Sequence, residues 1–188
     1  MANYCFVRHG QTDWNIEGRW QGHSDVSLNE TGEEQARNAA EILKGTTFTA
    51  IYSSDLKRAY ATAAAINANH QLPIQIDKRL REQHLGNWEG LGVKEVPGLF
   101  PDLWRSFTDD PVTTVITGGE SLKDLADRMR EFHFDTQSKH GSDENILVVA
   151  HGLSLAVLIC MLEDRPFTEA YKLIPANASP IFHPPLSS

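Results

Sequence analysis

Two short runs of apolar residues dominate the hydrophobic pattern of the chain. Tyr4 to Val7 and Ile146 to Ala150 are apolar at consecutive positions rather than at alternate ones. Continuous apolar runs of this length are typical of strands that a parallel sheet buries on both faces. Two weaker runs, Ala50 to Tyr52 and Ile74 to Ile76, are also predicted to be strands.

Helical periodicity fills the stretches between these strands. Thr31 and Glu34 have the spacing of a capping box before one apolar stripe. Further stripes begin at Leu56 and Leu122, and the segment from Leu153 to Leu162 is apolar almost all round. Strands that alternate with helices predict an α/β fold with a mainly parallel central sheet.

Residues 81–117 interrupt this alternation with Pro97, Pro101, Pro111 and several glycines. A structureless loop of this length is unusual in a compact domain. We therefore expect a helical insertion that caps one end of the sheet. The 188 residues are expected to form one domain, because this length supports one substantial core.

Composition and charge restrict the classes of partner. The net charge of −8 disfavours nucleic acid and anionic membranes, because both require a basic protein surface. No apolar run approaches the ~20 residues of a membrane-spanning helix, and the N-terminus lacks the pattern of a secretory signal. Cys5 and Cys160 lie far apart in apolar runs, as buried thiols in a reducing compartment do, so a cytoplasmic protein is expected.

Two histidine–glycine pairs follow the two strongest predicted strands. Arg8, His9 and Gly10 follow the first strand, and His151 and Gly152 follow the second. Ligands of open α/β sheets bind at the carboxyl ends of strands, so the two histidines are expected to face each other there. The glycines permit tight turns and close backbone approach. Taken alone, Arg8 and His9 fit two interpretations equally well. They could belong to a functional site, or they could be a solvated arginine and a hydrogen-bonded surface histidine at a strand end.

A third polar segment, Ser53 to Ala59, follows the predicted strand at residues 50–52. Its serines and Asp55 are typical of a helix N-cap, so Arg58 would lie in the first turn and point toward the same sheet edge. A surface ion pair between Arg58 and Asp55 is the alternative, and on this segment alone it is the simpler interpretation.

Five short motifs extend over residues 7–152. They are RHG with Asn15, SSDLxRA at 53–59, REQHLGNWEG at 81–90, GGES at 118–121 and VVAHG at 148–152. In this order they resemble the histidine phosphatase superfamily, the phosphoglycerate mutase-like group. Each motif is weak alone, but five in order are specific. The resemblance implies a three-layer α/β/α sandwich and a phosphohistidine mechanism.

By position, the resemblance implies a phosphate pocket around a histidine nucleophile, His9. The implied catalytic residues are Arg8, His9, Arg58, Glu82 and His151. The implied phosphate-binding residues are Arg8, Asn15, Gln21, Gly22, Arg58, His151 and Gly152.

These residue types suit phosphoryl transfer, in which negative charge spreads over three equatorial oxygens. The planar fork of arginine binds two such oxygens at once and stays charged. A histidine nucleophile must be neutral on its attacking nitrogen, so we expect the other ring nitrogen of His9 to donate to a backbone carbonyl. No metal or cofactor is implied, because the arginines supply the positive charge.

Glu82 matches the position that supplies the proton in the phosphatase branch. It could protonate the leaving alkoxide if partial burial keeps it protonated, and then deprotonate the attacking water. A solvated carboxylate is the alternative interpretation of Glu82, and Glu89 is the competing proton donor.

The remaining histidines are not spaced as metal ligands are. We expect each of them to lie at the surface or to have its hydrogen bonds made within the fold. Of these, His23 and His84 could line the entrance to the site. Tryptophans are expected mostly in the core, with one or two in the loops that shape the substrate pocket. The histidines other than His9 and His151 are His23, His70, His84, His133, His140 and His183.

The expected function is hydrolysis of small phosphorylated metabolites, in a monomer or homodimer without nucleic-acid or membrane partners. The mutase branch typically has threonine- or serine-Gly-Trp where this chain has Gln21, Gly22 and His23. The chain therefore resembles the phosphatase branch, near the broad-specificity and α-ribazole phosphatases. Phosphoglycerate mutase activity and an inactive phosphate-binding or scaffolding domain are the alternatives.

The sequence after Ser179 contains Pro184 and Pro185, which cannot donate to a β-ladder. Family members usually continue with a further strand pair after the Asn-Ala-Ser of residues 177–179. The final edge strand is therefore expected to be missing.

Overall fold

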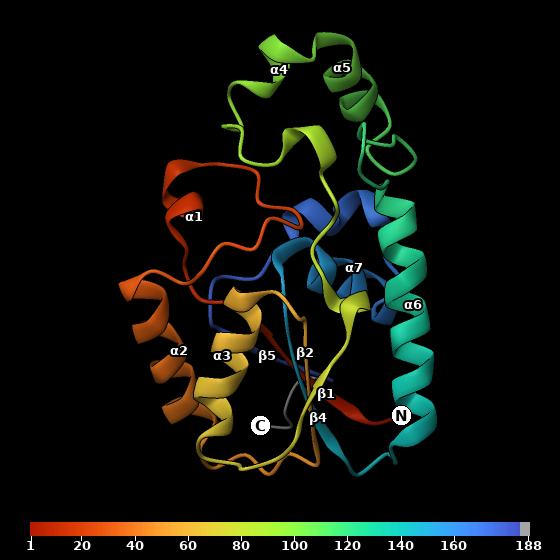
Figure 1. Cartoon of the computed structure of the whole chain (residues 1–188). Helices are drawn as coiled ribbons and strands as arrows, with labels where there is room; N and C mark the ends of the chain where they lie inside the picture. Colours follow the sequence, from red (N-terminus) through yellow and green to blue (C-terminus); the bar gives the residue numbers. More distant parts are fainter. Residues whose placement is uncertain (185–188) are drawn as a thin grey trace.

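The computed structural model describes residues 1–184 and contains one five-stranded sheet (Figure 1). The strand order is β3-β2-β4-β1-β5, with β5 antiparallel to β1 and the other neighbours parallel. The predicted mainly parallel sheet is confirmed. The strands are β1 (Asn3–Arg8), β2 (Ala50–Ser53), β3 (Ile74–Ile76), β4 (Asn145–Ala150) and β5 (Pro180–His183).

Helices cover both faces of the sheet, with α2 and α3 on one face and α6 and α7 on the other (Figure 1). The three-layer α/β/α arrangement is therefore confirmed. The α-helices are α1 (Asp13–Glu17), α2 (Glu30–Leu43), α3 (Lys57–Asn67), α4 (Val96–Leu99), α5 (Pro101–Asp109), α6 (Leu122–Lys139) and α7 (Gly152–Leu162). The 3-10 helices are η1 (Lys78–Leu80), η2 (Gly86–Trp88) and η3 (Phe167–Lys172).

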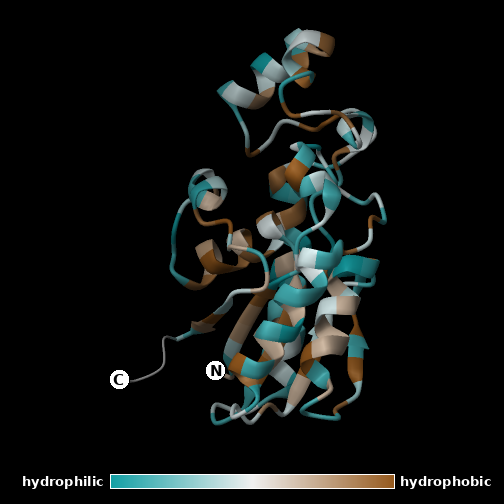
Figure 2. Ribbon diagram, turned by 90° about the vertical axis from the view of Figure 1, so that its left-hand side faces the viewer, coloured by the Kyte–Doolittle hydropathy of each residue, from teal (hydrophilic) through white to brown (hydrophobic). Residues whose placement is uncertain are grey.

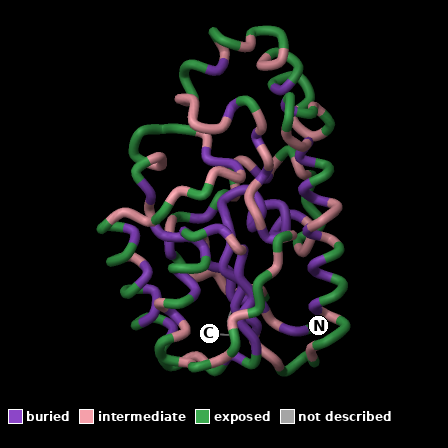
Figure 3. The backbone as a smooth tube through the Cα atoms, in the orientation of Figure 1, coloured by how far each residue is buried: buried purple, intermediate pink, exposed green. Residues whose placement is uncertain are grey.

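Burial on both faces explains why β1 is apolar at every central position. Side chains of a strand alternate between the two faces of its sheet. Tyr4 and Phe6 pack into the cluster that includes α6 and α7, whereas Cys5 and Val7 pack into the cluster under α2 and α3. Figure 3 shows the sheet as the most buried part of the molecule.

The helix caps differ from the sequence prediction in two places. Helix α2 begins one residue before Thr31, and the side chain of Asn29 accepts a hydrogen bond from the Gly32 N–H, so the predicted capping box is wrong. Leu56 is the N-cap of α3, and it has no side-chain cap. Arg58 nevertheless lies in the first turn of α3, as expected.

Residues 81–117 contain η2, α4 and α5 and extend beyond the ends of the strands (Figure 1). Their apolar side chains form a separate buried cluster, and Figure 2 shows hydrophobic positions within this region. The segment is therefore a packed helical structure and not an open loop. The fully or nearly buried members of this cluster are Leu85, Trp88, Val96, Phe107 and Ile116.

An edge strand follows Ser179, contrary to expectation. Residues Pro180–His183 form β5 and pair with β1 from Tyr4 to Val7. Pro180 opens this strand, a position that proline tolerates. Pro184 follows the strand, so it removes no ladder bond within it, and Pro185 lies outside the described residues.

Candidate active site

His9 lies just beyond the carboxyl end of β1 and is only 3% exposed. Its Nδ1 lies 2.7 Å from the carbonyl oxygen of Gly10 and is placed to donate to it. Burial, aided by the positive charges of Arg58 and Arg8, holds the pKa of His9 well below its usual range. The imidazole is therefore neutral near pH 7, with the proton on Nδ1 and a lone pair on Nε2.

His151 follows β4 and lies against His9, with ring centroids 5.2 Å apart. The two strands are adjacent and parallel, which brings the histidines together as predicted. His151 Nε2 lies 2.9 Å from the Ser54 hydroxyl oxygen. Burial, followed by the charge of Arg58, holds the pKa of His151 well below its usual range. The ring is fully buried, and it does not line the cavity, although the resemblance implies that it binds phosphate there.

Arg58 is completely buried, and backbone carbonyls orient its guanidinium group. Nη1 donates to the Ser24 carbonyl at 2.7 Å, and Nη2 donates to the Gly22 carbonyl at 2.8 Å. Burial lowers the pKa of Arg58 to about 10, opposed chiefly by the charge of Glu82, so the group stays protonated at neutral pH. The alternative pairing with Asp55 is wrong.

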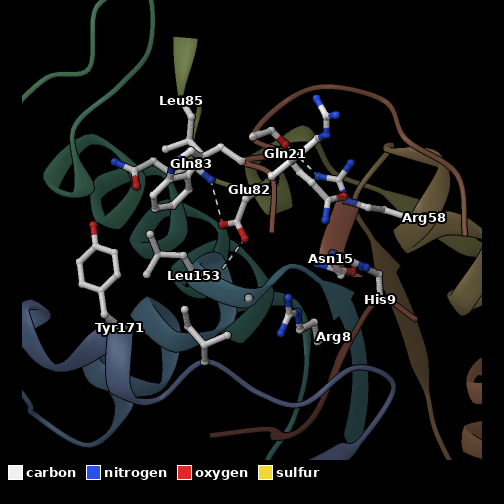
Figure 4. Close-up of a pocket in the computed structure, with 15 residues that line it drawn as sticks. Arg8, His9, Asn15, Gln21, Arg58, Glu82, Gln83, Leu85, Leu153 and Tyr171 are labelled. Atoms are coloured by element: carbon white, nitrogen blue, oxygen red, sulfur yellow. Dashed lines mark hydrogen bonds between the residues drawn. The ribbon is translucent and has the colours of Figure 1, made fainter. Parts of the chain in front are cut away.

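Asp55 instead makes a bidentate ion pair with Arg81, at 2.5 and 2.7 Å. This pair leaves Arg58 free to point into the cavity (Figure 4).

Arg8 reaches the same cavity from the end of β1, and its Nη1 donates to the Pro175 carbonyl at 2.9 Å. Burial lowers the pKa of Arg8, and the charge of Glu82 opposes the shift. Gly152 packs directly beside it, since a Cβ at Gly152 would lie 3.4 Å from Arg8 Nε and 2.9 Å from Ile174 Cγ2. Gly152 therefore makes room for the arginine.

Six buried polar atoms in or beside this cavity have no hydrogen-bond partner within residues 1–184, and they include Trp20 Nε1, Gln21 Oε1 and the Tyr171 hydroxyl. The other three lie on basic side chains and are Arg8 Nε, Arg58 Nε and His151 Nδ1. Native structures pair nearly all buried polar groups, and an unpaired one costs free energy. Two of the three are cationic N–H donors, so the set is suited to an anion that would complete their hydrogen bonds.

The Glu82 carboxylate is held at the N-terminus of α7. Leu153 N–H donates to its Oε2 at 3.1 Å and Ser154 N–H donates to its Oε1 at 3.2 Å. Gln83 N–H also donates to Oε1, at 2.9 Å. Figure 4 shows Glu82 between the Arg58 side of the cavity and the Leu153 side. Glu82 thus faces the cavity in a fixed orientation, unlike a freely solvated carboxylate.

Glu89, the competing proton donor, does not line the cavity. Its carboxylate accepts from the backbone N–H groups of His23 and Leu85 and from the Ser24 hydroxyl. These bonds join two loops, and they give Glu89 a structural place behind the site.

Asn15 lies in the cavity wall as expected. Its Oδ1 accepts from the backbone N–H of Thr12 at 3.0 Å, and the Thr12 side chain accepts from Asn15 N, which forms a capping box on α1. Because the amide oxygen is used in the cap, the Nδ2 group is the part of Asn15 that suits an anionic ligand.

Gln21 and Gly22 both line the cavity, but they differ in what they contribute. Gln21 is 9% exposed, and its Oε1 has no partner within the described chain. Gly22 has φ +50°, a left-handed conformation that suits glycine, and its carbonyl orients Arg58. Gly22 is thus a support for Arg58.

The cavity has a volume of about 160 Å³. Arg8, His9 and Arg58 line one side of it, and Leu85, Leu153 and Tyr171 lie on the other side (Figure 4). His23 and His84 stack on each other with ring centroids 4.5 Å apart, and neither lines the cavity, so their place at the entrance stays a prediction. The sequence indicated that one or two tryptophans shape the pocket, but it did not indicate the other residues of the cavity wall. Those residues lie outside the five motifs or at motif positions without a recognised role. The lining residues not singled out individually as site residues are Arg19, Trp20, Gln83, Leu85, Leu153, Tyr171 and Ile174.

The histidine phosphatase superfamily (branch 1) matches residues 4–181. This chain belongs to the histidine phosphatase superfamily. The family, the fold and a phosphatase of this group were all expected from the motifs, and all three are confirmed.

Named relatives show the same relationship. Glucosyl-3-phosphoglycerate phosphatase of Mycolicibacterium vanbaalenii is 39% identical over 172 residues, which cover 88% of this chain and 76% of that protein. Phosphoserine phosphatase 1 of Hydrogenobacter thermophilus is 33% identical over 179 residues, which cover 95% of this chain and 84% of that protein. The solved structure of mycobacterial glucosyl-3-phosphoglycerate phosphatase with VO3 has a TM-score of 0.87 at 35% identity and covers 97% of this chain and 92% of that chain.

Within residues 1–184, no group of three or more His, Cys, Asp or Glu side chains is placed to hold a metal ion. In the same part of the chain, no helix combines the length and apolar character required to cross a bilayer.

Proposed function

We propose that the chain hydrolyses small phosphomonoesters through a phosphohistidine formed on His9. The observation that carries the proposal is the neutral His9 ring beside two buried guanidinium groups whose Nε atoms lack partners in the described chain. A phosphate dianion would supply those missing acceptors and would lie in line with the lone pair of Nε2.

In the first step, His9 Nε2 attacks phosphorus and the ester P–O bond breaks. Arg8, Arg58 and Asn15 stabilise the charge on the phosphoryl oxygens. Protonated Glu82 gives its proton to the leaving alkoxide, which departs as the alcohol.

In the second step, Glu82 accepts a proton from water, and the resulting hydroxide attacks the phosphohistidine. The P–N bond breaks and returns the electron pair to His9 Nε2, which releases inorganic phosphate. The hydrogen bond from Nδ1 to Gly10 fixes the ring throughout, so that the same nitrogen is used in both steps.

His151 has a supporting role in this scheme. Its ring packs on His9, and its buried Nδ1 has no hydrogen-bond partner within the described chain. Residues 81–117 act as a cap, because Glu82, Gln83 and Leu85 bring this insertion into the cavity wall of one continuous domain. The buried free thiols Cys5 and Cys160 suit a reducing, cytoplasmic location.

The substrates are small phosphorylated metabolites, a class supported by the cavity volume of about 160 Å³ and by the names of relatives that act on glucosyl-3-phosphoglycerate and phosphoserine. A screen of phosphomonoesters with phosphate release as the readout tests the proposal, with isomerisation of phosphoglycerate measured in parallel. Phosphate release without isomerisation is expected. Isomerisation faster than release would favour the mutase, and neither activity would favour a binding domain.

A further inference from the structure

Arg128, on helix α6, binds the backbone of the segment that carries Glu82. Its Nη1 donates to the carbonyl oxygens of Arg79 at 2.5 Å and Arg81 at 2.7 Å. Its Nη2 donates to the carbonyl oxygen of Glu82 itself at 2.8 Å. One side chain therefore holds three carbonyls within four consecutive residues.

Glu120 fixes the guanidinium group of Arg128 from the other side. Nη2 and Nε of Arg128 donate to the two Glu120 carboxylate oxygens at 2.5 and 3.2 Å. The side chains of the two residues are 17% and 18% exposed, so solvent screens this pair only weakly. Glu120 also accepts from the His84 N–H and donates its own N–H to the His84 carbonyl, both at 2.9 Å.

The position of the Glu82 carboxylate depends on its backbone being held at this point. The carboxylate reaches the N–H groups of Leu153 and Ser154, whereas the carbonyl of the same residue is bound by Arg128 and lies 2.9 Å from His23 Nε2. Arg128 itself does not line the cavity. Its direct hydrogen-bond link to the cavity is through the backbone carbonyl of Glu82.

We propose that Arg128, fixed by Glu120, is the positioning residue for the proton donor Glu82. This inference rests on the proposed function, in which Glu82 protonates the leaving alkoxide. The planar guanidinium offers several donors in one fixed fork, and a lysine ammonium cannot reach the same three carbonyls and a carboxylate together. A displacement of about 1 Å at a catalytic group can cost about 10²-fold in rate.

The test compares two substrates in the Arg128→Gln and Arg128→Lys variants. The value of kcat/KM reports phosphoryl transfer to the enzyme, and it is measured for 4-nitrophenyl phosphate and for glycerol phosphate. Nitrophenolate leaves without a proton, whereas an alkoxide requires one. We expect kcat/KM for glycerol phosphate to fall roughly 10–100-fold, while the value for 4-nitrophenyl phosphate changes only about 2–3-fold. Lysine is expected to rescue little of the loss.

The matched control is Arg130→Gln, two residues along α6, where Arg130 pairs at the surface with Asp127 and is 43% exposed. This control should leave kcat/KM for both substrates unchanged. A second test combines Arg128→Gln with Glu82→Gln. Because Arg128 is proposed to act through Glu82, the ratio of kcat/KM between the two substrates in this double variant should match that of Glu82→Gln alone.

Equal losses on both substrates in folded Arg128 variants, or no loss at all, would overturn the positioning role. Denaturant midpoints establish that each variant is folded, and Glu120→Gln supplies an independent variant with the same expected preference. If the wild-type protein released no phosphate from any ester, the proposed function itself would fail, which is a different outcome from normal wild-type activity with unselective Arg128 variants.

Discussion

The imidazole rings of His9 and His151 lie with their centroids 5.2 Å apart at the carboxyl ends of two adjacent parallel strands. Both rings are buried, and burial is the largest cause that holds the pKa of each well below its usual range. Two neutral imidazoles in contact, next to two arginines, make this region of the molecule sensitive to protonation.

Stability should fall as the pH is lowered from 7 to 5. An unfolded histidine has a pKa of about 6.5 and takes up a proton in this range, while His9 and His151 in the folded protein do not. The unfolded state therefore binds more protons below pH 6.5, and the stabilisation present above that value is progressively lost. Urea unfolding at a series of pH values measures this. The His9→Asn/His151→Asn protein should show a shallower dependence, and an unchanged slope would count against neutral buried rings.

Replacement of Arg58 by glutamine should lower kcat/KM roughly 10²–10³-fold, comparable to the loss of an oxyanion donor. The reason is that Arg58 is fully buried with its charge facing the anion site. Steady-state kinetics with 4-nitrophenyl phosphate measures the change, and Arg37→Gln on the exposed face of α2 is the matched control. A loss no larger than that of the control would remove Arg58 from the site.

Replacement of Glu82 by glutamine should affect substrates unequally. The variant keeps the shape of the side chain but has no proton to give, so kcat/KM for an alkyl phosphate should fall about 10²–10⁴-fold. Nitrophenyl phosphate should be affected much less, since its leaving group is stable as an anion. Equal losses on both substrates would show that Glu82 is not the acid. Glu89→Gln should show no such preference, because the Glu89 carboxylate is bonded to His23, Ser24 and Leu85 away from the cavity.

Alanine at Gly10 and at Gly152 should have different consequences. A Cβ at Gly10 would overlap the backbone carbonyl of Gly32, which cannot easily move, so the cost in stability should be about 1–3 kcal/mol or more. A Cβ at Gly152 would press on the side chains of Ile174 and Arg8, so catalysis should suffer more than stability. Thermal unfolding and kinetics separate the two effects. Gly45→Ala, where a Cβ would have open space, is the control.

Sequence reasoning predicted the strands and the convergence of Arg8, His9, Arg58 and His151 because local patterns fix them. Continuous apolar runs locate buried strands, and parallel strands bring their carboxyl ends to one edge. The positions that it missed depend on contacts between distant segments. Asp55 pairs with Arg81 and not with its helical neighbour Arg58, and this choice follows from the path of the insertion.

Other differences have the same origin. His151 was expected in the cavity wall, but its ring is fully buried against His9 and does not line the cavity. Tyr171 and Ile174 come from a segment without any recognisable motif, and only the packing of η3 against α7 brings them to the cavity. The β5 strand was missed because its prolines lie at its start and after its end.

The most direct measurement is to locate the phosphoryl group after brief exposure of the protein to a phosphomonoester. The sample is quenched in base, because phosphohistidine is stable there and labile in acid, and its peptides are examined by mass spectrometry. The account predicts one phosphoryl group on the peptide that contains His9, removed by mild acid and absent in His9→Ala. A phosphoryl group on another residue, or phosphate release by His9→Ala at the wild-type rate, would contradict it.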